Sequence, residues 1–479
     1  MISTKINTII IAVLLSVCTL FGQTRQKTID AFVSIPNLQQ ASVGVSVKDF
    51  SGKEIISYNS QKSLTPASTL KLVTTATALE LLGKNFRYET TLYRNGDKLY
   101  VVGSGDPTLG TKHFDRDQYM FLDQWADVIS KFFEGEEIEE IVVIDDVFGY
   151  EGVSWRWIRQ DMGNYYAAGA YGISVFDNTY ELYFDTTDKS TAPKIVKTVP
   201  EMPFLDFTNT LTLNTTGRDN GYIMGEPFSN KRLLSGNIPA GRTSFSIKGD
   251  IPDPGMCLAE KLKATLESKN VKVQKISTAR NDYELNRYES LRKRQWGDVI
   301  YRYRSFPLSE IVQNINFKSN NHFSEHLIRT LGRLKNGDIY SSALDEGIEQ
   351  INDFWKEKGV KTEALFMYDG CGLAPSNAVS PSLLCDILVY MQTKSKNADV
   401  FLKSLPQAGK EGTVRNLAKG TRLVGKLYAK SGSIVNVRCY AGYYISGDTK
   451  YAFSIMVNNY RGSNAELTKA IERLMLGLF

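Results

Sequence analysis

The chain has few of the residues that build metal sites or disulfide frameworks. Only five of its 479 residues are cysteines, and three are histidines. Cys18 lies in the N-terminal segment, and the other four are widely scattered: Cys257, Cys371, Cys385 and Cys439. This spacing fits neither a metal-ligand pattern nor a dense disulfide framework. We therefore expect no metal or cofactor, and we expect Cys385, within the apolar run 383–391, to be a core residue.

The chain also lacks a large excess of charge of either sign. Its 57 lysines and arginines against 52 acidic residues give a net charge of +5. There is no basic stripe with interleaved aromatic residues, so nothing in the sequence indicates nucleic-acid binding. The hydrophobic share of 42% is ordinary for a globular protein, and the length allows two or three domains.

Long apolar runs are absent beyond the first residues. Lys5 is followed by an apolar stretch from Ile9 to Phe21 and then by Gly22-Gln23 and polar residues. This pattern is typical of a secretory signal, with an apolar core too short for a membrane span. Cys18 raises the question of a lipoprotein, but Val17 stands where a small residue is expected. We therefore expect residues 1–23 to be a cleaved signal peptide and the mature chain to be periplasmic.

Three short motifs carry most of the chemical information, and they occur in a fixed order: Ser68-Thr69-Leu70-Lys71, Ser319-Asn320-Asn321 and Lys430-Ser431-Gly432. Together they have the pattern of a serine acyl-transfer site whose base is a lysine. Each motif alone is a weak signal, because a second Ser-x-x-Lys begins at Ser290 and Ser-x-Asn recurs at Ser57, Ser235, Ser268 and Ser395.

The residues around Ser68 distinguish it from Ser290. Apolar residues recur after it at helical spacing until Gly83: Leu70, Leu72, Val73, Ala76, Leu79 and Leu82. The pattern predicts a buried helix with Ser68 in its first turn, where free backbone N–H groups favour negative charge. A helix-capping serine is the alternative interpretation. Ser290 lies in a charged run and begins no apolar face.

The spacing of Ser68 and Lys71 places both side chains on one face of a helix. A lysine acts as a base only when neutral, so its pKa must be lowered by burial or by a neighbouring cation. Lys430 is the candidate neighbour. Two positive charges about 4 Å apart repel by roughly 4 kcal/mol at an effective dielectric near 20, which is about three pKa units. We therefore expect Lys430 to keep much of Lys71 neutral.

The remaining polar motif residues have expected roles. Ser319 would relay a proton to the leaving group, and Asn321 would hold Lys71 and a substrate amide. Lys430 and Ser431 would bind a substrate carboxylate.

Backbone groups complete the expected site. Gly432 has no side chain, which would let its strand approach the substrate closely. The backbone N–H groups of Ser68 and Ser433 would form an oxyanion hole.

Hydrophobic periodicity predicts an α+β chain. One antiparallel sheet flanked by helices is expected from both chain ends, with strands at 41–47, 55–58, 422–429, 435–444 and 451–457 and helices at 309–317, 321–334, 343–358 and 464–476. Between them we expect a hairpin at 87–102 that turns at Asn95-Gly96, a buried strand at 141–144 and β-rich sequence to about residue 250. A helix at 118–133 is expected to bury Phe121, Trp125, Val128, Ile129 and Phe132.

The separation of Ser68 from Ser319 predicts an insertion. If both serines line one cleft, the segment between them must leave the catalytic domain and return to it. We expect a catalytic domain made of residues 24–88 and 300–479, with a large β-rich accessory insertion at 89–299.

These features resemble the class C low-molecular-mass penicillin-binding proteins, which are D-alanyl-D-alanine carboxypeptidase/endopeptidases. The resemblance covers nearly the whole mature chain and includes five segments beyond the motifs: 103–109, 369–373, 379–381, 409–415 and 441–443. It implies a β-lactamase/transpeptidase-like catalytic domain, with Ser68 as nucleophile and Lys71 as base. It also implies hydrolysis of peptidoglycan stem peptides and covalent inhibition by β-lactams. The residues predict no oligomeric state.

The resemblance extends to one acidic residue and shows two departures. Asp161 is similar to an acidic residue that reads the amino group of the stem-peptide diamino acid; an ordinary exposed aspartate is the alternative. Ser431 stands where threonine is commoner, which keeps the hydroxyl. Cys371 replaces the usual serine and is expected to be a small buried residue.

Other functions compete with this interpretation. Residues 322–326 match the inverted zinc-protease pattern His-x-x-Glu-His, but His113 is the only other histidine, and we expect His322 and His326 on the flank of their helix without a metal. A β-lactamase or an esterase is the alternative within the same fold. A catalytically silent cell-wall-binding protein is the non-enzymatic alternative.

Overall fold

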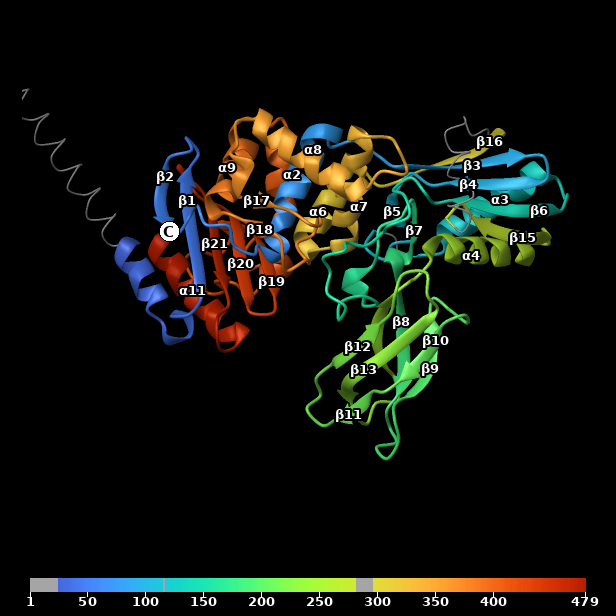
Figure 1. Cartoon of the computed structure of the whole chain (residues 1–479), viewed down its shortest axis with the longest axis horizontal. Coiled ribbons are helices and arrows are strands. Elements are labelled where there is room, and N and C mark those ends of the chain that lie inside the picture. Colours follow the sequence, from blue (N-terminus) through green and yellow to red (C-terminus); the bar gives the residue numbers. More distant parts are fainter. Residues whose placement is uncertain (1–24, 115–116, 281–295) are drawn as a thin grey trace, which may run out of the picture.

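The computed structural model describes residues 25–114, 117–280 and 296–479. The two ends of this chain lie together at one end of the molecule, and the middle of the chain forms the other end and a separate lower lobe (Figure 1). None of the helices in these ranges combines the length and hydropathy that crossing a bilayer requires. The expected signal peptide, with Cys18, lies outside the described residues.

A five-stranded antiparallel sheet joins the two chain ends in the order β19-β20-β21-β1-β2. Its strands are β1 (Ser42–Asp49), β2 (Glu54–Tyr58), β19 (Leu427–Ile434), β20 (Val437–Ser446) and β21 (Thr449–Asn458). The predicted α+β class and antiparallel sheet are confirmed. The expected strand at 422–429 is misplaced, because turns at Gly420 and Gly425, with φ of 77° and 74°, delay the strand to Leu427. The Lys430-Ser431-Gly432 motif therefore lies within β19.

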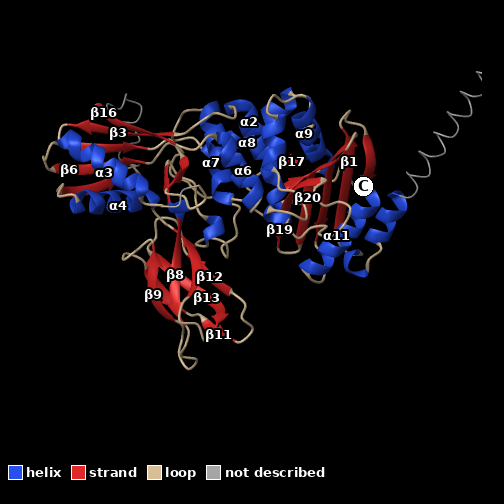
Figure 2. Ribbon diagram, turned by 180° about the vertical axis from the view of Figure 1, so that it is seen from behind, coloured by secondary structure: helices blue, strands red, loops and turns tan. Residues whose placement is uncertain are grey.

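Helices cover both faces of this sheet (Figure 2). One face shares a core with α2 (Lys71–Leu82), α6 (Leu308–Lys318), α7 (Asn321–Lys335), α8 (Ala343–Glu357), α9 (Pro381–Thr393) and α10 (Ala398–Ser404), and α9 lies directly against its strands. The other face packs against α11 (Asn464–Leu478) and the helix at 25–33. Side chains of β20 point alternately to the two faces of the sheet. Cys439 and Tyr443 lie in the core shared with α9, and Tyr440 and Tyr444 lie in the core shared with α11. The helices predicted at 309–317, 321–334, 343–358 and 464–476 are confirmed within one or two residues.

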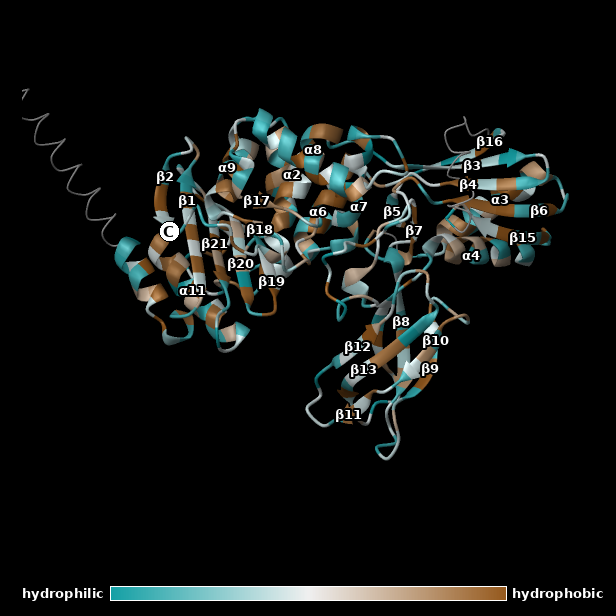
Figure 3. Ribbon diagram, in the orientation of Figure 1, coloured by the Kyte–Doolittle hydropathy of each residue, from teal (hydrophilic) through white to brown (hydrophobic). Residues whose placement is uncertain are grey.

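The middle of the chain begins with a second five-stranded sheet in the order β15-β6-β4-β3-β16. Its strands are β3 (Glu89–Asn95), β4 (Lys98–Val102), β6 (Ile138–Ile144), β15 (Val273–Thr278) and β16 (Asp298–Arg304), and it packs against α3 (Met120–Phe133) and α4 (Pro254–Ser268). Strands β4 and β6 are mainly hydrophobic, as core strands should be (Figure 3). The predicted hairpin is confirmed as β3 and β4. Because β16 pairs with β3, we assign residues 300–304 to this sheet.

Short strands form the lower lobe and its connection to the rest. The lobe contains β8 (Thr179–Asp185), β9 (Lys194–Val199), β10 (Asp206–Asn209), β11 (Thr212–Asn214), β12 (Asn220–Met224), β13 (Lys231–Pro239) and β14 (Phe245–Asp250). Outside the lobe, β5 (Asp106–Leu109) pairs with β7 (Ile173–Val175) in the same inserted segment. The pair β17 (Leu365–Phe366) with β18 (Ala378–Val379) belongs instead to the catalytic region. The segment between the two catalytic motifs is thus rich in strands.

The buried face of α3 differs from the prediction by one residue. Phe121, Trp125 and Ile129 are buried as expected, but Phe132 is 44% exposed and Phe133 is fully buried. Successive residues are about 100° apart around a helix. A small error in the predicted direction of the buried face therefore places the wrong one of two neighbouring side chains in the core.

This exchange can be tested by stability. Phe133→Ala removes a fully buried ring and should lower the free energy of unfolding by about 3 to 5 kcal/mol. Phe132→Ala should lower it by far less, about 1 kcal/mol or below, because this residue is 44% exposed. Urea denaturation of both variants gives the comparison, and similar losses for the two would contradict the assigned helix face.

Candidate active site

Ser68 lies in a tight 3-10 turn, η2 (Ala67–Leu70), that leads directly into α2. The predicted helix and its end at Gly83 are confirmed, although the first turn is tighter than an α-helix. Ala67 has a φ of 46°, which is uncommon for a residue other than glycine. Strain of this kind is typical of functional sites.

Two glycines allow neighbouring segments to pack closely against this turn. A Cβ on Gly432 would lie 2.5 Å from the Pro66 carbonyl oxygen and 3.1 Å from the Ser68 nitrogen. A Cβ on Gly372 would lie 2.0 Å from the Ala67 carbonyl oxygen. Gly432 therefore allows β19 to pack against the backbone of the Ser68 turn. From the sequence, this glycine was expected to allow close approach to the substrate.

Lys71 contacts the adjoining Ser68 turn and two distant segments of the chain. Its amino group contacts Ser68 Oγ at 3.0 Å, Asn321 Oδ1 at 2.6 Å and the Cys371 carbonyl oxygen at 2.6 Å. The amide of Asn321 is oriented by a second bond, because its Nδ2 donates to the Tyr166 carbonyl oxygen at 2.7 Å. The expected contact between Asn321 and Lys71 is present, and Lys71 is fully buried.

Burial is the main cause of the altered basicity of Lys71. Loss of hydration lowers the pKa of Lys71 below its ordinary value of 10.5, although Cys371, Asp369 and Glu325 oppose this shift. The expectation that the charge of Lys430 is the main cause is wrong. Burial also lowers the pKa of Lys430, and the charge of Lys71 lowers it further. Burial is thus the main cause for both amino groups, and the repulsion between the lysines is a second effect that lowers the pKa of Lys430.

The loop that supplies the Cys371 carbonyl is held by buried polar contacts. The Gly370 carbonyl accepts from the hydroxyl groups of Thr74 and Ser324, both at 2.7 Å, and the Gly370 N–H donates to Glu325 at 2.7 Å. Asp369 accepts from four groups: the N–H groups of Gly372 and Ala374 and the side chains of Trp157 and Asn377. Cys371 is fully buried, as predicted.

Ser319 contacts the other lysine. It occupies the left-handed region with a φ of 62°, directly after α6. Lys430 donates to Ser319 Oγ and to the Ser431 carbonyl oxygen, both at 2.8 Å. Ser431 Oγ lies 2.9 Å from Thr413 Oγ1, and Ser433 is exposed further along β19. β19 is an edge strand of its sheet, and its Gly432 lies against the Ser68 turn.

Asp161 lies beside this site. Tyr166 Oη donates to Asp161 Oδ1 at 3.0 Å, and the backbone of Tyr166 orients Asn321. Burial raises the pKa of Asp161 above its ordinary value, and the bond from Tyr166 opposes the shift. Of the two tryptophans shortly before it, Trp157 is buried and Trp155 is 83% exposed.

The two histidines, expected on the flank of α7, are both buried. His326 Nδ1 contacts the Gly105 carbonyl oxygen at 2.7 Å, and His326 Nε2 lies 3.0 Å from His322 Nε2. They therefore join α7 to the inserted segment. Glu325 instead pairs with Arg329 at 2.7 Å.

One group of side chains has the spacing of metal ligands. Among the described residues, the ligand atoms of Glu325, Asp369 and Cys371 lie within 4.8 Å of one another and are buried. The carboxylate oxygens already accept the hydrogen bonds that hold the 369–374 loop. We assign them to the support of Lys71.

Comparison with protein-family models identifies the family of this chain. The D-Ala-D-Ala carboxypeptidase 3 (S13) family model matches residues 25–477. The chain belongs to this family. It is therefore a serine-type hydrolase, and the resemblance seen in the sequence is confirmed.

Relatives of this S13 family member match along most of their length. A D-alanyl-D-alanine carboxypeptidase of Actinomadura sp. (strain R39) is 27% identical over 463 residues, which cover 91% of this chain and 81% of the relative. The crystal structure of penicillin-binding protein 4 from Haemophilus influenzae has a TM-score of 0.75 at 20% identity, covering 94% and 98% of the two chains. The same protein complexed with a β-lactam has a TM-score of 0.72 at 19% identity, with the same coverage. These structures confirm the predicted fold.

The structure also adds residues to the site that the motifs did not reveal. The Cys371 carbonyl is one, although the Asp369-Gly370-Cys371-Gly372 segment signalled a constrained loop. Tyr166, which orients Asn321 through its backbone, had no sequence signal.

The close packing of Gly432 against the Ser68 turn can be tested by substitution. Gly432→Ala should displace the Ser68 turn and slow acylation by labelled penicillin about 100-fold, because small misplacements of reacting groups have effects of this size. Gly337→Ala is the matched control, since a Cβ at that position meets no neighbour within 4 Å. Equal acylation rates in the two variants would show that the close packing at Gly432 does not position Ser68.

Proposed function

We propose that the protein is a serine D,D-peptidase of peptidoglycan stem peptides. It removes the terminal D-Ala, cleaves cross-links between stem peptides, or does both, through an acyl-enzyme on Ser68. The observation that carries this proposal is the buried amino group of Lys71 at 3.0 Å from Ser68 Oγ, in a chain of the D-Ala-D-Ala carboxypeptidase 3 family.

The contacts of Lys71 suit a neutral base. A neutral amino group has two N–H donors and one lone pair. The two N–H groups can donate to Asn321 Oδ1 and to the Cys371 carbonyl, both at 2.6 Å. The lone pair then accepts the proton of the Ser68 hydroxyl. The two short contacts therefore orient the lone pair of the Lys71 nitrogen toward the Ser68 hydroxyl.

The reaction has two steps. Ser68 Oγ attacks the carbonyl carbon of the penultimate D-Ala while its proton passes to Lys71, and the peptide bond breaks as Lys71 passes that proton through Ser319 to the leaving amine. Water then attacks the resulting ester while Lys71, neutral again, takes a proton from it. Lys71 returns this proton to Ser68 Oγ as the ester bond breaks, which restores the free hydroxyl and releases the acid product. Lys430, which donates to Ser319 at 2.8 Å, positions that hydroxyl for the proton relay.

Substrate binding is assigned to the groups around this centre. Lys430 and Ser431 bind the terminal carboxylate, and Gly432 keeps β19 against the Ser68 turn. The N–H groups of Ser68 and Ser433 stabilise the oxyanion. Asp161, beside Tyr166, reads the amino group of the diamino acid. β-Lactams acylate the same serine, as the complexed relative suggests, and residues 1–23 direct the chain to the periplasm.

Labelled penicillin tests the nucleophile and separates the competing functions. A D,D-peptidase should retain the label as a long-lived acyl-enzyme, a β-lactamase should release it quickly, and a silent binding protein should not take it up. Ser68→Ala should abolish labelling, whereas Ser290→Ala, at the second Ser-x-x-Lys, should leave it intact. Labelling that survives Ser68→Ala would refute the assignment.

The base can be tested by pH. Peptidase activity requires neutral Lys71, so kcat/KM should rise with pH as Lys71 loses its proton. Because burial lowers the pKa of Lys71, this rise should be centred below the ordinary lysine value of 10.5. Lys71→Arg keeps its charge at all these pH values and should lower kcat/KM by at least about 100-fold. A rise centred near 10.5 would contradict a buried neutral base.

A further inference from the structure

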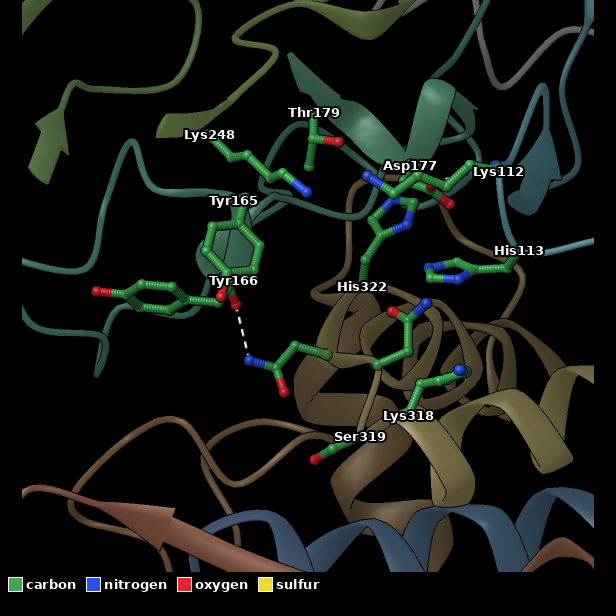
Figure 4. A pocket seen from close by; sticks show the side chains of 12 residues that line it. Lys112, His113, Tyr165, Tyr166, Asp177, Thr179, Lys248, Lys318, Ser319 and His322 are labelled. Carbon is green, nitrogen blue, oxygen red and sulfur yellow. Dashed lines mark hydrogen bonds between the residues drawn. The ribbon is translucent and has the colours of Figure 1, made fainter. Parts of the chain in front are cut away.

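A pocket of about 340 Å³ opens beside Ser319 and Asn321 and is not used by the mechanism above (Figure 4). Its walls come from the catalytic helices α6 and α7 and from the inserted segment, which contributes η3 (Tyr165–Ala167), η4 (Phe176–Asn178) and β14. Ser319 and Asn321 therefore border this pocket and also contact the two lysines of the reaction centre.

Positive charge dominates this pocket. Lys112, Lys248 and Lys318 line it, while Asp177 is its one acidic residue among the described lining residues. Asp177 already accepts hydrogen bonds from the hydroxyl and N–H groups of the 111–112 segment. Lys248 pairs with Glu181 at 3.2 Å, but within the described ranges no carboxylate pairs with Lys112 or Lys318.

Two of these lysines face one another. Figure 4 shows the amino ends of Lys112 and Lys248 pointing toward each other. Burial lowers the pKa of Lys112 and the charge of Lys248 lowers it further, although Asp177 and Glu181 oppose this shift. An anion between them would relieve this repulsion and replace the lost hydration.

A buried acceptor lies in the same wall. His326 Nδ1 donates to the Gly105 carbonyl, and burial holds the pKa of His326 well below its usual value, so its Nε2 carries no proton. His322 Nε2 must then be the donor of the pair that the two rings form at 3.0 Å. Burial lowers the pKa of His322 to about 3, which leaves its Nδ1 without a proton. This atom has no partner among the described residues, although His322 is only 5% exposed.

We propose that this pocket binds an acidic residue of the peptide substrate, with the carboxylate between Lys112 and Lys248 and a peptide N–H on His322 Nδ1. This inference rests on the proposed function, because it extends the substrate from Ser68 into the pocket. The carboxylate is additional to the terminal one that Lys430 and Ser431 bind. Its source is the cleaved strand or the second strand of a cross-linked substrate, and the chemistry is the same for both.

The experiment compares acid and amide forms of matched substrates. One pair is a linear peptide that ends in D-Ala-D-Ala and carries one further side-chain carboxylate, with the amide as partner. The other pair is a cross-linked dimer with that carboxylate or amide on the leaving strand. We expect the acid form of at least one pair to be favoured about tenfold in kcat/KM at low ionic strength, and this preference should shrink as salt is added.

Variants connect this preference to the pocket. The double substitution Lys112→Met with Lys248→Met should reduce the acid-to-amide ratio to about 1. Lys450→Met removes an exposed lysine of β21 and should keep the wild-type ratio. A ratio near 1 in the wild type for both pairs, or a ratio that the double substitution leaves unchanged, would overturn the inference.

The proposed function is judged by a separate measurement. Labelled penicillin reports on Ser68 without a peptide in the pocket. A labelled wild type with no acid preference would refute the pocket alone, whereas an unlabelled wild type would refute the peptidase function itself.

Discussion

The complete burial of the Lys71 amino group is the interaction on which the rest of this site depends. An ammonium group without water is costly unless it is paired, so burial favours the neutral form that a base requires. Its three nearest partners, Ser68 Oγ, Asn321 Oδ1 and the Cys371 carbonyl, are all uncharged. Hydration therefore controls the basicity of Lys71 more than the second lysine does.

This burial requires support from the whole catalytic region and from the insertion. The 369–374 loop closes over Lys71 because Asp369 and Glu325 accept its N–H groups. Gly372 and Gly432 let that loop and β19 pack directly on the Ser68 turn. The inserted segment completes the arrangement, since its Tyr166 carbonyl fixes the orientation of the Asn321 amide. The insertion is thus part of the geometry of the site and also forms one wall of the lysine-rich pocket.

Much of the site could be predicted from sequence, because a three-residue spacing on a helix fixes the relation of Ser68 to Lys71. The misses have physical causes. The Cys371 carbonyl is a backbone group, so its side chain gave no signal of the contact. Phe133 takes the buried place expected for Phe132, because a helix rotates by about 100° per residue. The buried histidines of α7 could not be foreseen, since the inserted segment covers them.

The sequence by itself determined the order of the three motifs, the local helix that carries two of the reacting groups, the α+β class and the family. Only the tertiary structure decided why Lys71 can act as a base and which lysines share the neighbouring pocket. The physical reason is that spacing along a chain fixes neighbours within one element, whereas hydration depends on every segment that packs around a group. Asn321 and Cys371 reach Lys71 from 250 and 300 residues away.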